Sequence, residues 1–144
     1  MRTALKNGLG ISPITNANVS GRATVGEMLV LLSWAVFLSG YPTPSVLPII
    51  QYESHEFFVE NACNGRECKV FGLYQDDGII HIDEAHKEDT SLVVHELTHF
   101  LQDKDMEPCA REREAYAVQQ EYIIQVLASV RMVRPKACKQ DTIS

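Results

Sequence analysis

The chain has 144 residues, 45% of them apolar and 22% charged, which suits one globular domain with one hydrophobic core. Its net charge of −6 and the lack of a basic cluster in the sequence argue against nucleic acid as a partner. The most apolar run, 28–38, is shorter than the roughly 20 residues that cross a bilayer, so we expect no stable membrane span.

The N-terminal part divides into a polar leader and the start of the domain. Residues 1–22 are rich in Gly, Asn and Ser and show no periodicity, which predicts a flexible leader before a single domain at 23–144. The apolar run 28–38 predicts a buried helix over 24–39, ended by Gly40 and the prolines after it. The same run has the length of a signal-peptide core, and this alternative stays open from the sequence.

The middle of the chain is typical of short strands. We expect a strand over 47–52, a short helix over 55–60, and two further strands over 69–74 and 79–83. The link between the last two contains Asp-Gly, which predicts a hairpin. The histidines of this region are expected on the surface: His55, His81 and His86.

Four cysteines are present, and none forms a CxxC pair. Cys63 and Cys68 are close enough to bridge across a short loop. Cys109 and Cys138 flank the predicted last helix, which spans roughly 30 Å, so we do not expect a direct bridge between them. Disulfides would place the protein in the cell envelope or outside the cell, and free thiols would place it in the cytoplasm.

A helix predicted over 88–102 contains the sequence His95-Glu96-Leu97-Thr98-His99. Residues i and i+4 share a helix face with Cβ atoms about 5–6 Å apart, so His95 and His99 can bind one zinc ion. Glu96 lies on the same turn and can reach a metal-bound water as a general base. The alternative is a core helix whose polar side chains are hydrogen-bonded to neighbours.

A tetrahedral zinc needs a third protein ligand, with the fourth position left for water. The last helix, predicted over 110–132, offers two glutamates. Glu112 is in helical phase with the apolar position Ile123, whereas Glu114 is in phase with Glu121 and should face solvent. We therefore predict Glu112 as the ligand and keep Glu114 in reserve; a solvated carboxylate is the alternative for either.

The motif at 95–99, followed by Glu112-x-x-Ala115, resembles the gluzincin metallopeptidases, and the small size with a hairpin before the helix resembles their minigluzincin subset. The resemblance covers about residues 69–125. It implies that the strand at 79–83 lies along the cleft and pairs with an extended peptide. Family members often carry Asp directly after that alanine, as a partner for a zinc histidine, where this chain has Tyr116.

We expect an α+β fold, in which a small three-stranded sheet packs on the HExxH helix, a long C-terminal helix and an N-terminal helix. The expected function is zinc-dependent hydrolysis of a peptide or protein substrate, with Zn²⁺ bound by His95, His99 and Glu112 and with Glu96 as general base. The alternatives are a non-catalytic metal- or peptide-binding module on the same scaffold, or a latent enzyme blocked by its own terminal segments.

Overall fold

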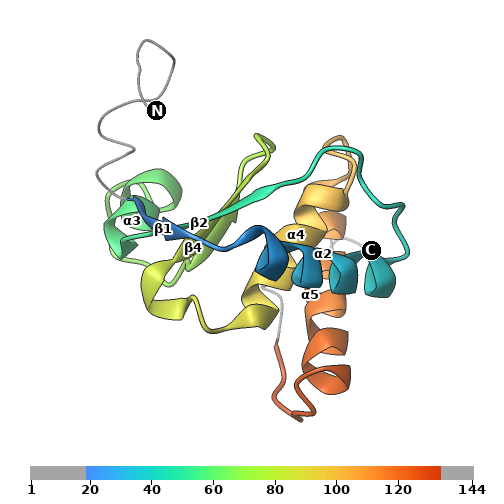
Figure 1. Ribbon diagram of the computed structural model, residues 1–144. Helices are drawn as coiled ribbons and strands as arrows, with labels where there is room; N and C mark the ends of the chain where they lie inside the picture. The colour runs from blue at the N-terminus through green and yellow to red at the C-terminus, as the bar shows by residue number, and fades with distance from the viewer. Residues whose placement is uncertain (1–18, 134–144) are drawn as a thin grey trace.

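The computed structural model describes residues 19–133, which form an α+β fold as expected (Figure 1). One mixed sheet contains these strands: β1 (Val19–Arg22), β2 (Ile49–Glu53), β3 (Gly72–Tyr74) and β4 (Ile79–Asp83). The α-helices of the described residues are α2 (Val25–Ser39), α3 (His55–Ala62), α4 (Thr90–Leu101) and α5 (Pro108–Gln125). A short 3₁₀ helix, η1 (Glu84–His86), leads from β4 toward α4.

The sheet has four strands in the order β1-β2-β4-β3, one more than predicted. The extra strand is β1, which pairs antiparallel with β2 through an irregular register. Its residues Val19–Arg22 belong to the stretch expected as a flexible leader, so that expectation is wrong for these four residues. The strand was missed because it is short, polar and stabilised by hydrogen bonds to β2 rather than by an apolar pattern. The rest of the predicted leader, 1–18, lies outside the described residues.

The first helix forms where it was predicted. Thr24 caps α2 in a reciprocal pair with Glu27, and Gly40 ends the helix in the left-handed conformation with φ of 82°. Only one side of α2 is buried, at Met28, Leu32 and Ala35, and Phe37 is 71% exposed, so the expectation of a buried helix is wrong for the other side. No helix of the described residues is long and apolar enough to cross a membrane, as expected.

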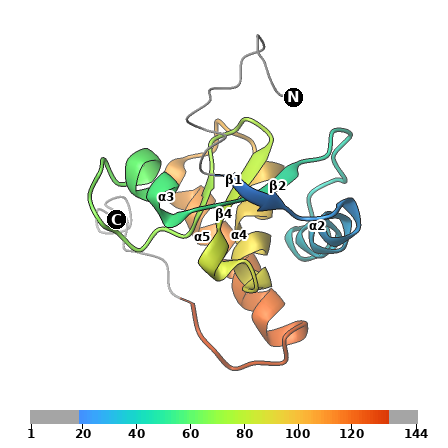
Figure 2. The same ribbon diagram turned by 60° about the vertical axis from the view of Figure 1, so that its left-hand side comes forward.

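The two faces of the sheet have different chemistry. Apolar side chains on one face, including Ile80 and Ile82, join Val94 and Leu97 of α4 in the hydrophobic core. Figure 2 shows α4 lying beside α5, and these two helices make the most extensive contact in the fold. Because side chains of a strand alternate between the two faces, α4 packs on the apolar face of the sheet, over β3 and β4.

The opposite face of the sheet is polar and is covered by α3. His81 is buried there, hydrogen-bonded to Glu53 and stacked on Phe57, so its expected surface position is wrong. His55, expected on the surface, is half-buried, and its Nδ1 lies 2.7 Å from Asp83 Oδ2. Local sequence could not reveal these pairs, because Glu53 and His81 are 28 residues apart.

A disulfide joins Cys63 to Cys68, in the loop between α3 and β3, with a Cα–Cα distance of 6.2 Å. No cysteine of the described residues is a free thiol. Cys138 lies outside the described residues. The prediction that it does not bridge directly to Cys109 therefore also falls outside the described part of the chain.

The last helix ends at Gln125, well before the predicted end at 132. Ala128 adopts a left-handed conformation with φ of 50°, and the amides of Leu127 and Ser129 donate to carbonyls of the last helical turn. The chain therefore turns back here, although no glycine or proline marks the turn in the sequence.

Candidate metal centre

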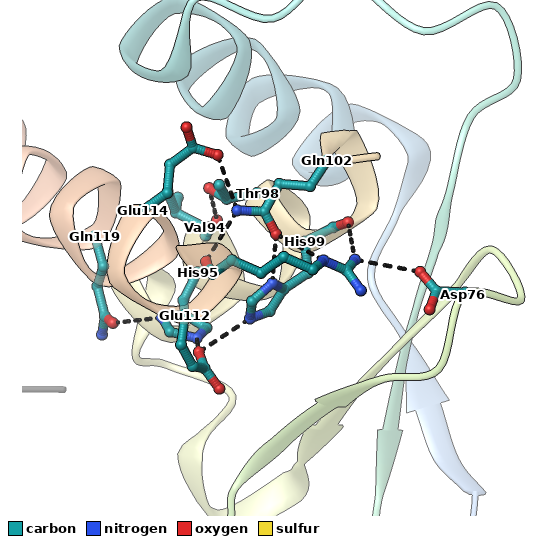
Figure 3. Close-up of polar contacts among 10 residues, drawn as sticks. Asp76, Val94, His95, Thr98, His99, Gln102, Glu112, Glu114 and Gln119 are labelled. Carbon is teal, nitrogen blue, oxygen red and sulfur yellow. Dashed lines mark hydrogen bonds and ion pairs between the residues drawn. The ribbon is translucent and has the colours of Figure 1, made fainter. Parts of the chain in front are cut away.

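His95, His99 and Glu112 come together where α4 packs against α5. The carboxylate Oε1 of Glu112 lies 2.9 Å from Nε2 of His95 and 3.1 Å from Nε2 of His99. Figure 3 shows both imidazole rings turned toward this carboxylate. One potential ligand atom from each residue lies within 4.8 Å of the others, and two imidazole nitrogens with one carboxylate oxygen form a donor set that zinc accepts.

Glu114, the reserve ligand, lies away from this cluster. Its Oε1 accepts hydrogen bonds from Gln102 Nε2 at 2.9 Å and from the hydroxyl of Tyr41 at 2.6 Å. Glu114 is therefore half-buried, and the expectation that it faces solvent is wrong. Glu112 is the more exposed of the two, at 48% of its side chain, because it stands in the first turns of α5 beside an open cavity.

The hydrogen bonds of Gln102 determine the tautomer of His99. The Gln102 amide nitrogen donates to the carbonyl of Arg111 and to the Glu114 carboxylate, two groups that can only accept. The amide oxygen of Gln102 must therefore face His99 Nδ1, which lies 2.7 Å away and donates to it. In the neutral ring the proton is therefore on Nδ1, and Nε2, which lies 3.1 Å from Glu112 Oε1, is the nitrogen left for a metal ion; in the protonated ring Nε2 donates to Glu112.

A second glutamine, Gln119 on α5, offers its amide oxygen to Nδ1 of His95, as Gln102 does to Nδ1 of His99. Its Oε1 lies 3.0 Å from His95 Nδ1, and its amide nitrogen donates to the hydroxyl of Ser91 at 3.3 Å. Tyr116, which stands where the resemblance implies Asp, packs edge-on against the His95 ring at 4.5 Å between centroids. Gln119 thus supplies the hydrogen bond to a ligand histidine, and such partners orient the ring and fix its tautomer.

The electrostatics favour a cation at this point. Hydrogen bonds to His95 and then to His99 hold the pKa of Glu112 far below its usual range, so Glu112 is ionised. Burial lowers the pKa of His99, but the hydrogen bond to Glu112 and the charge of Glu96 outweigh it and raise the pKa overall. The two rings therefore lie in a field that attracts positive charge, whether a proton or a metal ion.

Glu96, which lies beside the three candidate ligands, is a buried carboxylate without a hydrogen bond from the described residues. It is only 6% exposed, its carboxylate accepts no hydrogen bond from any residue between 19 and 133, and burial raises its pKa. A buried carboxylate without a partner is costly, and such groups concentrate at functional sites. Gly72 on β3 lies opposite: a Cβ added there would stand 2.9 Å from Glu96 Oε2.

A cavity of about 370 Å³ opens beside Glu96. One wall is the segment 69–72, which runs into β3, and the other walls come from α4 and α5. Two candidate metal ligands, His95 and Glu112, and the candidate general base, Glu96, all line this cavity. A substrate group placed in it would therefore contact both.

The strand beside the cavity is β3, and the resemblance had implied β4. β4 lies between β2 and β3 and is paired on both sides, so it has no free edge for a peptide, and that expectation is wrong. In the β3–β4 ladder, the amide of Asp83 donates to the carbonyl of Phe71, which makes Gly72 a non-hydrogen-bonded position. The N–H and C=O of Gly72 therefore point away from β4, toward the free edge.

Comparison with models of protein families, with curated protein sequences and with solved structures finds no match to this chain. Sequence reasoning missed three residues of the site: Gln102, Gln119 and Gly72. Two of them carried a detectable signal, because Gln102 follows His99 by three residues and Gln119 follows Glu112 by seven, both helical spacings.

Proposed function

We propose that this protein is a zinc-dependent peptide hydrolase, with His95, His99 and Glu112 as metal ligands and Glu96 as general base. The observation that carries the proposal is the buried Glu96 carboxylate, which has no hydrogen-bond partner in the described part of the chain and adjoins three convergent ligand atoms. A structural carboxylate in that position would need a partner, whereas a general base needs its oxygens free for water.

In this proposal the three ligands hold the metal ion, and Glu96 transfers the proton. Zinc bound at the three ligands would act as a Lewis acid, lowering the pKa of a coordinated water and polarising the scissile carbonyl. Glu96 accepts the proton of the attacking water and returns it to the leaving amine. Its burial raises its pKa, which brings this carboxylate closer to the pH at which such a transfer is efficient.

The free edge of β3 supports an extended peptide as the substrate. A peptide that pairs with this edge would use the outward N–H and C=O of Gly72 and would run past Glu96. The missing side chain of Gly72 leaves room for this approach. The Cys63–Cys68 bridge suits a secreted or cell-envelope protein, and we include that location in the proposal.

The decisive experiment combines metal analysis with peptide cleavage. Purified protein should contain one zinc per chain and should cleave members of a peptide library, and a chelator should abolish the cleavage. Glu96→Gln should retain zinc and lose about 10²–10⁴-fold in kcat/KM, because an amide cannot accept the proton.

Glu121→Gln is the matched control, since Glu121 is an exposed carboxylate of α5 that accepts a hydrogen bond from Gln125. Zinc binding without cleavage by the wild type would favour the non-catalytic binding module. Unchanged turnover in Glu96→Gln would show that the assigned base is wrong.

A further inference from the structure

The outer side of α2 is apolar, although no residue between 19 and 133 covers it. The one charged residue of this helix is Glu27, whose carboxylate accepts from the backbone amide of Thr24 at the cap. Val30 is 59% exposed and Phe37 is 71% exposed. Figure 2 shows α2 at the edge of the molecule, with the sheet and the other helices on one side of it. A helix that is apolar on all sides is normally enclosed, so the outer side of α2 indicates a contact beyond the described residues.

The exposed residues of this side repeat with the spacing of packed helices. They are Gly26, Val30, Ser33 and Phe37, and we call these four residues the seam. Along the seam the steps of four, three and four residues match positions a and d of a heptad. Side chains with this period lie in one narrow stripe, which fits a second helix that crosses at about 20°. The spacing therefore favours a helix as the occupant of this face.

The seam is ready for burial without a polar cost. Its one polar side chain is Ser33, whose hydroxyl donates to the carbonyl of Leu29 at 2.8 Å, so an apolar partner leaves no unpaired donor there. The Phe37 ring meets Trp34 edge-on at 6.0 Å between centroids, and Trp34 meets Tyr122 of α5 edge-on at 6.4 Å. Phe37 is thus an aromatic side chain on a packed support, which is typical of the residues that anchor interfaces.

The seam is complementary to a copy of itself. Small residues, Gly26 and Ser33, alternate with the larger Val30 and Phe37. When two α2 helices lie antiparallel about a twofold axis between residues 31 and 32, Gly26 faces Phe37 of the second copy. In the same arrangement Ser33 faces Val30 of the second copy, so every large side chain enters the space above a small one. A parallel pair would instead place Phe37 against Phe37 and Gly26 against Gly26, with a clash at one end and a gap at the other.

The space that this pairing needs at Gly26 is open. A Cβ added there would meet only Thr24 Oγ1, at 3.9 Å, among the described residues. The charge of the chain also favours this face for self-association. The protein carries a net charge of −6, so two copies repel each other at most surfaces, whereas the seam contains no charged residue.

We propose that the protein forms a symmetric dimer through an antiparallel pair of α2 helices, in which Phe37 of each copy packs over Gly26 of the other. A surface that is complementary to itself closes with twofold symmetry and leaves no free seam for a third copy. One pair of short helices is at the small end of specific interfaces, so we expect a Kd of roughly 1–100 µM. No seam residue lines the cavity beside Glu96, so the dimer is independent of the proposed hydrolysis.

Sedimentation equilibrium of the purified full-length protein measures the dimer Kd. Between about 1 µM and about 1 mM the wild type should change from monomer to dimer. Phe37→Ala should raise the Kd at least about tenfold, because it removes the aromatic anchor. Gly26→Leu should do the same, since the added side chain fills the space that Phe37 of the second copy occupies. Val130→Ala is the control: it shortens an apolar side chain that is 93% exposed, after α5, and should leave the Kd unchanged.

A double variant tests which residues face each other. In Gly26→Leu/Phe37→Ala the large and small positions are exchanged, and the introduced leucine faces the introduced alanine of the second copy. This variant should dimerise with a Kd within about threefold of wild type and more tightly than either single variant, as coupled residues do. A parallel pair would show no such rescue. Circular dichroism verifies that each variant keeps its helix content.

A wild type that stays monomeric up to about 1 mM overturns the proposal, whether residues outside 19–133 or another protein then cover the seam. A double variant that dimerises no better than Gly26→Leu overturns it as well. Vesicles of neutral phosphatidylcholine test a membrane surface as the occupant. The wild type should stay in the supernatant, and a monomer that sediments with the vesicles, more completely so in Gly26→Leu, would assign this face to a membrane and overturn the dimer.

Discussion

Glu112 and Glu114 stand two residues apart on α5, and their side chains go to different partners. Glu112 meets both histidines, whereas Glu114 is hydrogen-bonded to Gln102 and Tyr41. The contact with Glu114 and burial raise the pKa of Tyr41 to about 12, so the hydroxyl stays protonated and keeps donating. Glu114 therefore supports the glutamine that orients His99 without facing the metal candidates itself.

This difference predicts unequal effects of two conservative substitutions. Glu112→Gln should weaken zinc binding by at least about tenfold, because a neutral amide oxygen replaces a charged ligand. Glu114→Gln should have a much smaller effect, since its amide oxygen can still accept from Gln102 and Tyr41. Zinc titrations of the two variants make the comparison, and a larger loss in Glu114→Gln would reverse the assignment.

Gly72 is the second residue whose identity follows from its surroundings. An added Cβ would stand 2.9 Å from Glu96 Oε2 and 3.1 Å from both Glu96 Cγ and Leu92 Cδ1. Gly72→Ala should therefore displace the Glu96 carboxylate. A misplacement of about 1 Å can cost roughly 100-fold in rate, so kcat should fall strongly while zinc content stays at one per chain.

Gly26→Ala is the matched control, because a Cβ at that exposed position on α2 meets only Thr24 Oγ1 at 3.9 Å. Steady-state kinetics and zinc analysis of both variants provide the measurement. Wild-type turnover in Gly72→Ala would mean that Glu96 does not need its present position.

At the scale of elements, the loop closed by the Cys63–Cys68 disulfide leads directly into the segment 69–72, which forms one wall of the cavity. Cys68 closes the bridged loop that begins at Cys63, and residue 69 follows it directly. The loop is also held by His55, whose Nε2 lies 2.8 Å from Glu67. Beyond the bridge, the ring of Phe71 stacks on His86 at 3.9 Å between centroids. The wall thus depends on contacts at both of its ends.

Removing the bridge should loosen the wall and lower stability. Closing so short a loop is worth about 2 kcal/mol by the chain-entropy estimate, so Cys63→Ser/Cys68→Ser should lose about that much free energy of unfolding in urea. The amides of 69–71 should also exchange faster with deuterium, while those of α4 should keep their protection. An unchanged exchange rate at 69–71 would show that His55 and Phe71 suffice to hold the wall.

At the scale of the whole molecule, the candidate ligands connect two helices, α4 and α5, that also meet through apolar packing and through hydrogen bonds such as Gln119 to Ser91 and Tyr122 to Thr90. A ligand that binds only the folded state stabilises it by mass action, by about 2.7 kcal/mol at a free concentration 100 times its Kd. Zinc should therefore raise the melting temperature of the metal-free protein, by roughly 5–10 °C for a domain of this size.

His99→Ala is the variant that tests the location of the site. Without one imidazole the cluster should lose most of its affinity, so zinc should shift the melting temperature of this variant little. Differential scanning calorimetry with and without zinc measures both shifts. An equal shift in the two proteins would place the zinc elsewhere on the molecule.

Local features of the sequence were enough to predict several elements. The caps of α2 at Thr24 and Gly40 involve residues within four positions of the helix ends; the end at Gly40 was predicted, and the start was predicted to within one residue. The spacing of His95 and His99 likewise places both on one face of a single helix, wherever that helix packs. Helical phase also selected Glu112, the acid that lies against both histidines.

Only the tertiary structure decided the features that depend on distant segments. Tyr41 meets Glu114 across 73 residues, which is why Glu114 is half-buried although its helical phase predicts exposure. The order of the sheet places β4 in the centre and gives the free edge to β3, and no period within a strand encodes which neighbours it has. The end of α5 and the contact of Arg131 with Ser91, 40 residues away, likewise depend on where the chain returns. Periodicity reports which side of an element is buried, but the partner on that side is determined by packing of the whole chain.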